Sequence, residues 1–174
     1  GWDFSPVPIG NRCGGQGALV AEPCIWRVTD RNGMIYLYGA TDDSRIIARD
    51  QGGNPLHNGA ARAWALTKVI DLNGNAYEVE YYQNAGQYYP KAVRYTLGAG
   101  VSESFAVTFA YDESARADRF TAYTQGAHVQ TNWLLSEIAV IQRSSCLIFF
   151  TCSESIRRYG LSFETVMPQR QSRL

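Results

Sequence analysis

The chain has 174 residues, 45% of them hydrophobic, which is enough to bury a core as one domain or as two small β units. Its sixteen basic and sixteen acidic residues cancel, so no overall charge draws it to nucleic acid or to an anionic membrane. The longest apolar run, Cys146 to Phe150, falls far short of the roughly 20 residues that a membrane-spanning helix needs.

The first 24 residues hold Pro and Gly clusters with little hydrophobic periodicity, which predicts an irregular arm. Position 1 is Gly, and no basic-then-apolar leader follows it. We therefore expect that any secretion signal was removed or belongs to a longer parent chain.

Two copies of one pattern lie 41 residues apart: Asp30-Arg31-Asn32-Gly33 and Asp71-Leu72-Asn73-Gly74. In each copy an Asn-Gly pair separates two strand-like segments, which is the strongest short-range signal for a tight β-hairpin. We predict hairpins between residues 25–30 and 34–39 and between residues 64–71 and 76–83. Both glycines are expected to have positive φ.

Further strands are predicted after the second hairpin. Residues 93–97 and 105–111 flank a Gly-Ala-Gly connection and predict a third hairpin, and residues 127–131 predict a short strand. Residues 134–142 fit a helix or a strand, and we favour the strand. Residues 155–164 alternate, with Arg157, Tyr159, Leu161 and Phe163 on the face that we expect to be buried.

The predicted fold is therefore all-β, an antiparallel hairpin-repeat sheet that is sandwich-like or open and shell-like. Residues 25–164 form the predicted repeat domain, and residues 165–174 a truncated tail that leads into a further repeat. The predicted core residues are Trp26, Val28, Tyr36, Trp64, Leu66, Val69, Tyr77, Val107 and Phe109.

Several segments resemble one family in both order and spacing. They are residues 25–33, 36–39, 44–46, 64–75, 88–90, 107–111, 134–138 and 159–164, with Trp64 to Asn75 and Tyr159 to Glu164 among them. Across residues 22–164 the chain is similar to the Salmonella virulence plasmid B-type and insecticidal Tc-toxin B proteins, relatives of the Rhs and YD-repeat toxins. In residues 146–152 it departs from that pattern.

The resemblance implies a secreted, non-catalytic β scaffold that helps to encase or deliver a toxic effector. It also implies contacts with neighbouring β domains of the same toxin or with a toxin subunit, and it leaves room for a host surface ligand. Some members of the family carry an ADP-ribosyltransferase domain with a Glu-x-Glu signature, which Glu78-Val79-Glu80 matches. Because the other transferase elements are missing, we interpret this pair as a solvated strand face.

Other candidate sites have weaker support. Asp71, Asn73 and Asn75 imitate the start of an EF-hand, but Ala76 and Tyr82 occupy positions that need Gly and Glu. A lone calcium ion on turn oxygens is the alternative to Asp and Asn bonding to their own turn. His57 and His128 lie in no metal or nucleophile motif. We predict no catalytic, cofactor-binding or metal-binding residue and no cofactor.

The cysteines and the tyrosine pairs each allow two interpretations. The spacings of Cys13, Cys24, Cys146 and Cys152 are not those of zinc ribbons, so we expect free thiols, with disulfides as the alternative. The tyrosine pairs 81–82 and 88–89 would suit a glycan-binding surface module. Since adjacent strand residues face opposite sides, we instead expect one core ring and one surface ring from each pair.

Overall fold

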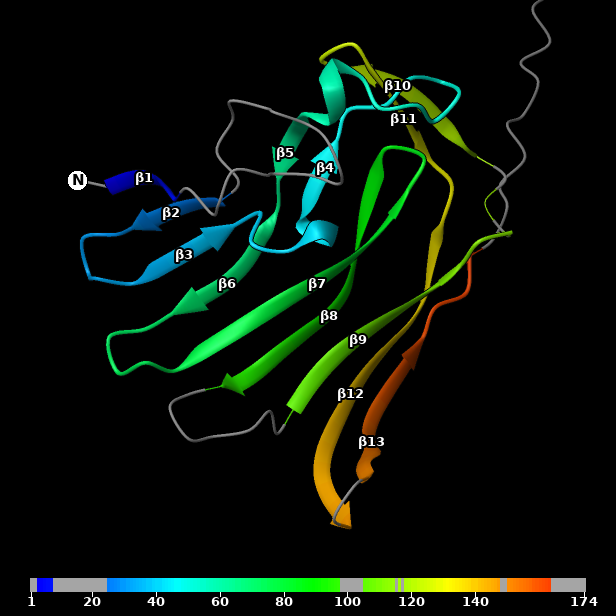
Figure 1. The fold of residues 1–174 in the computed structure, drawn as a ribbon. Coiled ribbons are helices and arrows are strands. Elements are labelled where there is room, and N and C mark those ends of the chain that lie inside the picture. The colour runs from blue at the N-terminus through cyan, green and yellow to red at the C-terminus, as the bar shows by residue number, and fades with distance from the viewer. Residues whose placement is uncertain are drawn as a thin grey trace, which may run out of the picture.

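The computed structural model describes residues 3–7, 25–97, 105–114, 116, 118–147 and 150–163. These residues form an antiparallel β structure with two short 3-10 turns (Figure 1). The strands are β1 (Asp3–Val7), β2 (Ile25–Thr29), β3 (Ile35–Tyr38), β4 (Arg45–Ile47), β5 (Ala61–Trp64), β6 (Leu66–Ile70), β7 (Ala76–Asn84), β8 (Gln87–Leu97), β9 (Phe105–Asp112), β10 (Phe120–Thr124), β11 (Ala127–Thr131), β12 (Leu134–Leu147) and β13 (Phe150–Gly160), and the turns are η1 (Asp42–Ser44) and η2 (His57–Gly59).

One nine-stranded sheet dominates the structure, in the order β1-β2-β3-β6-β7-β8-β9-β12-β13. The pairs that the structure describes between these neighbours are antiparallel, so the predicted all-β antiparallel class is confirmed. The three predicted hairpins are confirmed as β2–β3, β6–β7 and β8–β9, and residues 134–142 lie in strand β12. Of the first 24 residues, 3–7 are described, and they form β1 against β2.

The Asn-Gly turns have the geometry of three-residue hairpin loops, a type I turn followed by a glycine in the left-handed region. Gly33 and Gly74 have φ values of 79° and 81°, as predicted. The preceding aspartate shapes the loop, since Asp71 Oδ1 accepts the backbone N–H groups of Asn73 and Asn75 at 2.8 Å each. Asp30 Oδ1 accepts two N–H groups in the same way, at 2.8 and 2.9 Å.

A third copy of this loop lies between the other two in the sequence. Gly53, with φ of 82°, donates its N–H to the Asp50 carbonyl at 3.0 Å, and Asp50 Oδ1 accepts the Asn54 N–H at 2.8 Å. The Asn-Gly pattern does not predict this loop, because Gly52-Gly53 stands in place of Asn-Gly. The shared signal is an aspartate three residues before a glycine that must adopt positive φ.

Two small hairpins interrupt the sheet. Strands β4 and β5 pair between β3 and β6 in the chain, and β10 and β11 pair between β9 and β12. Because connections in an antiparallel meander alternate between the two ends of the sheet, both inserts lie at the end that carries the β7–β8 turn. Figure 1 shows the two inserts gathered above that turn.

The β7–β8 turn is the point where the inserts meet. The Gln130 N–H of β11 donates to the Ala85 carbonyl at 2.9 Å, and the Arg62 guanidinium of β5 donates to the Gly86 carbonyl. The inserts also bond to each other, since the His128 N–H donates to the Arg49 carbonyl at 2.8 Å. Three segments distant in sequence are thus fixed at one end of the sheet.

The 3-10 turn η1 covers an exposed strand edge. Strand β6 pairs with β7 only over Ala76 to Glu78, which leaves the upper half of β7 without a β6 partner. There Asp43 Oδ2 accepts the Tyr81 N–H at 2.7 Å, and Gln83 Nε2 donates to the Asp43 and Arg45 carbonyls at 2.9 Å. Satisfying a strand edge with side chains prevents it from pairing with another chain.

Burial is concentrated where the inserts and the sheet meet. Ser44 is fully buried, and its hydroxyl accepts the Thr67 hydroxyl at 3.1 Å and donates to the Thr41 carbonyl at 2.8 Å. Of the predicted core, Val28 and Val69 are buried, and most other members are half-buried. Tyr77 is exposed, so its assignment to the core was wrong.

The last strand also differs from its prediction. Residues 153–163 are all exposed, including Tyr159, Leu161 and Phe163, so the expected buried face of this segment was wrong. The physical reason is that β13 is the outermost strand of the sheet, and no second layer that the structure describes covers it. Within the described residues, no helix is long and apolar enough to cross a membrane.

Candidate functional site

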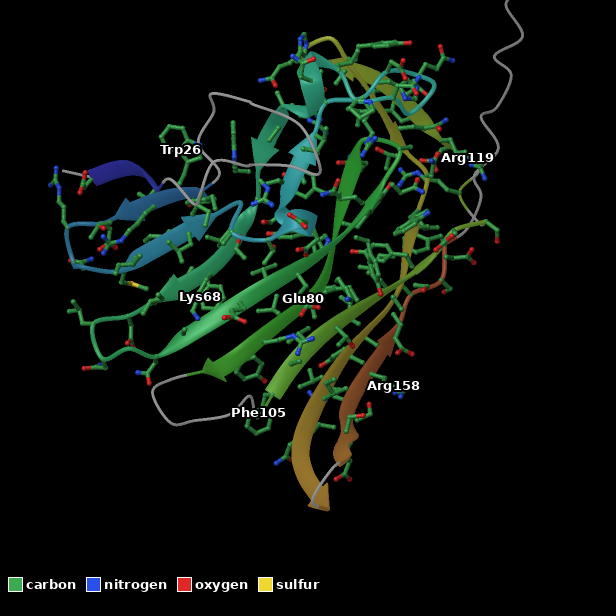
Figure 2. All side chains as sticks on the ribbon, in the orientation of Figure 1. Trp26, Lys68, Glu80, Phe105, Arg119 and Arg158 are labelled. Atoms are coloured by element: carbon green, nitrogen blue, oxygen red, sulfur yellow. The ribbon has the colours of Figure 1, made fainter. Side chains whose placement is uncertain are left out.

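The candidate functional region is the middle of β7 and β8, where the Glu-x-Glu pair and the tyrosine pairs lie. Glu78 and Glu80 are on one face of β7, as alternation predicts. Glu78 Oε1 is 2.8 Å from Lys68 Nζ on β6, and Glu80 Oε1 is 2.8 Å from Arg94 Nη2 on β8. Figure 2 shows Lys68 and Glu80 on neighbouring strands in the centre of the sheet.

Both carboxylates are therefore ion-paired across strands. Lys91 adds a second cation, with its Nζ 3.3 Å from Glu80 Oε2. The Glu78 and Glu80 side chains are 40% and 32% exposed, so this face of β7 is partly accessible to solvent. Opposite charges in cross-strand positions stabilise a sheet by roughly 0.2 to 1 kcal/mol per pair. This arrangement suits the pair to holding β6, β7 and β8 together.

Four aromatic rings cluster beside this charged row: Tyr82, Tyr89, Tyr111 and Trp133. Tyr89 is buried, and its ring stacks on Trp133 with centroids 5.0 Å apart. Its hydroxyl accepts the backbone N–H of Asn132 at 3.0 Å. Tyr82 meets Tyr111 and Trp133 edge-on, at 6.3 and 5.7 Å between centroids. The cluster ties β7 and β8 to the segment that leads from β11 into β12.

The predicted division of the tyrosine pairs is confirmed for residues 88–89. Tyr88 is 38% exposed and Tyr89 is 7% exposed. Tyr82 is 39% exposed, but Lys91 Nζ lies over its ring at 5.6 Å from the centroid. The alternation of β7 and β8 was readable from sequence, whereas the contribution of Tyr111 and Trp133 was missed.

The turn oxygens are already used by the turn. Asp71 Oδ2 accepts the Asn75 side-chain amide at 2.8 Å, in addition to the two N–H bonds to Oδ1. The hydrogen bond from the Asn75 side chain is the largest cause that lowers the pKa of Asp71. Among the described residues, no group of three or more His, Cys, Asp and Glu side chains could hold a metal ion.

The remaining candidates do not form a site. His57 lies exposed in η2, and His128 lies in β11 with its ring against Tyr123 at 5.6 Å. Cys13 and Cys24 fall outside the described residues, and the side chains of Cys146 and Cys152 fall outside them too.

Tyr81 lies under the η1 turn, where its hydroxyl donates to the Leu66 carbonyl at 2.8 Å. Burial, together with the nearby Tyr88 and Asp43, raises the pKa of Tyr81 to about 12. The unfolded chain titrates this phenol near 10. The folded chain therefore keeps this proton to a higher pH than the unfolded chain does. The stability that Tyr81 contributes is complete below about pH 10 and is lost as the pH rises through about 12.

We expect the melting temperature of the native chain to fall between about pH 10 and about pH 12. The fall should be less steep in Tyr81→Phe, because phenylalanine at position 81 has no proton to lose. Thermal unfolding followed by circular dichroism at several pH values measures this difference. Tyr123→Phe, at an exposed tyrosine of β10, is the control and should keep the native slope. Equal slopes for Tyr81→Phe and the native chain would contradict the raised pKa of Tyr81.

The chain is similar in sequence to one known protein family. Residues 18–98 match a family model described as SpvB: Salmonella virulence plasmid 65kDa B protein. The resemblance to the SpvB family is confirmed. The match covers the first two hairpins, the β4–β5 insert and β8. Among curated proteins, none matches the sequence.

Two solved structures share the fold. The N-terminal domain of effector protein SpvB from Salmonella typhimurium strain LT2 matches at a TM-score of 0.57 and 16% identity, over 80% of this chain and 61% of that one. A TcdB2-TccC3-Cdc42 crystal structure matches at a TM-score of 0.53 and 16% identity, over 68% of this chain and 8% of that one. The chain thus spans about three-fifths of the SpvB domain and under a tenth of the second protein.

Proposed function

We propose that this chain is a non-catalytic structural module of a secreted toxin of the Rhs/Tc type, which supports the encapsulation or delivery of an effector. The observation that carries the proposal is the nine-stranded antiparallel sheet, whose candidate site is occupied by its own packing. Similarity to the SpvB family and to a structure that contains a TcdB2-TccC3 toxin component supports the toxin setting.

The charged row supports a structural role for the Glu-x-Glu pair. A transferase glutamate must be free to interact with its substrate, whereas Glu78 and Glu80 each contact a cation on an adjacent strand. Neutralising both glutamates should therefore lower the stability of the sheet without lowering any catalytic rate.

The aromatic cluster bears on the alternative, a glycan-binding surface module. Sugar recognition by stacking needs an accessible ring face. Tyr82 has Lys91 over its ring, Tyr89 is buried, and both contact Trp133. The rings therefore serve the packing of this chain, which supports the scaffold over the glycan-binding module.

The test uses the natural polypeptide that carries this sequence. Gly86→Val, which should unfold the module, is expected to expose the effector segment to protease and to lower its delivery into cells. The released effector should keep its specific activity. The Glu78→Gln/Glu80→Gln double variant should change neither effector activity nor nicotinamide release from NAD. Unchanged delivery by an unfolded module, or lost chemistry in a folded double variant, would contradict the proposal.

A further inference from the structure

Strand β13 has an exposed outer edge, and the structure describes its side chains from residue 153 onward. Strand β13 pairs with β12 and with no other described strand, and residues 153–160 are all exposed. Figure 2 places Arg158 on this outermost strand, at the rim of the sheet. The N–H and C=O groups along such an edge form a template for one more strand.

A β-bulge gives this edge an unusual charge pattern. Gln142 pairs with Glu154 and Val140 pairs with Arg157, so three steps along β13 match two steps along β12. The extra residue is Ile156, which is 55% exposed. Because Gln142 and Val140 lie two apart on one strand, they share a face of the sheet, and so do Glu154 and Arg157.

This pattern is complementary to itself. In a twofold antiparallel pair, if residue i faces residue j of the second copy, residue j faces residue i of the first. Placing the axis between Ser155 and Ile156 puts Glu154 opposite Arg157 of the second copy, twice, on one face of the joined sheet. Ile156, the extra residue of each strand, then lies beside the axis and opposite Ser155 of the second copy. The two bulges are therefore adjacent, and neither one shifts the pairing of Glu154 with Arg157.

The charges on this edge are available for such pairing. No ion pair joins Glu154 or Arg157 to another residue that the structure describes, and Arg157 Nη1 donates only to the Tyr159 hydroxyl at 3.2 Å. Without the bulge, residues 154 and 157 would lie on opposite faces and could not meet across the axis. The irregularity therefore creates the complementarity.

We infer that β13 is an interaction surface for a second copy of this chain, which pairs antiparallel with it and joins the two sheets through Glu154–Arg157 contacts. The inference stands apart from the proposed function, because it rests on the register of β12 and β13 and not on any relative. A partner other than a second copy of this chain would need carboxylates opposite Arg157, and its binding would not depend on Glu154.

Charge reversal in the 174-residue chain tests the pairing. By sedimentation velocity over a concentration series at low salt, the native chain should approach twice its 19.4 kDa mass. Arg157→Glu or Glu154→Arg should raise the dimer dissociation constant at least about tenfold, because like charges then face each other twice. The double variant Glu154→Arg/Arg157→Glu should restore dimerisation, since the attraction is rebuilt with its signs exchanged.

Arg119→Glu is the matched control, because it changes the net charge equally at an exposed position beside β10, away from the β13 edge (Figure 2). It should leave the dissociation constant unchanged. Circular dichroism confirms that each variant is folded. A native chain of single mass at every concentration overturns the inference, and so does a folded double variant that stays as weakly associated as Arg157→Glu.

Discussion

Replacing Gly86 with alanine should lower the free energy of unfolding by about 3 kcal/mol. Two causes act together at this position. The φ of Gly86 is 78°, in the left-handed region that residues with a Cβ atom avoid. A Cβ atom there would also lie 2.3 Å from the His128 carbonyl oxygen, which is backbone and cannot swing aside. The substitution must therefore push β11 away from the β7–β8 turn.

Gly126→Ala separates the two causes. Gly126 has the same φ of 78° in the β10–β11 turn, but a Cβ atom there meets nothing within 4 Å. It should cost only about 1 kcal/mol, the strain of the left-handed backbone. Urea denaturation of both variants measures the difference. Equal costs at the two positions would mean that the insert is not held against the turn.

Replacing Tyr89 with alanine should lower the free energy of unfolding by about 4 kcal/mol, as expected when a buried aromatic ring is removed. The ring contacts Tyr111 and Trp133, and its hydroxyl accepts the N–H groups of Asn132 and Trp133. Tyr89→Phe keeps the ring but leaves these two donors without their acceptor, so it should cost about 2 kcal/mol.

Tyr88→Ala is the control for this position. Tyr88 is the adjacent residue on β8, faces the opposite side and is 38% exposed. Its ring contacts only Tyr81 among the described rings, with centroids 5.6 Å apart, so its loss should cost about 2 kcal/mol, half the cost at Tyr89. Chemical denaturation gives the three values. Similar costs for Tyr88→Ala and Tyr89→Ala would contradict the aromatic cluster as a major source of stability.

Local turn chemistry explains which parts of the fold were predictable. Asn-Gly between alternating segments fixes both the position and the φ of Gly33 and Gly74, and the hairpins around them follow. The β4–β5 insert was not predicted, because its strands are three and four residues long and are too short to show an alternating pattern. The loop at Asp50 was missed because its signal is one aspartate and one glycine.

Long-range register explains what was not predictable in the candidate site. Alternation separates Tyr88 from Tyr89, but it cannot bring Trp133 to them, since that contact depends on how β9, β12 and the β10–β11 insert are aligned. Alternation also gave the wrong environment to β13. A period of two tells which residues share a face, whereas a covering layer depends on the rest of the chain.

The alternation of connections between the two ends of the sheet has a further consequence, for how such a chain can change through evolution. A hairpin contributes two strands, so it returns the chain to the same end and direction from which it started. Whole hairpins can then be gained or lost at the rim that carries β4–β5 and β10–β11, without altering the direction of any neighbouring strand. The two inserts that the structure describes follow this rule, since β3 still pairs with β6 and β9 still pairs with β12.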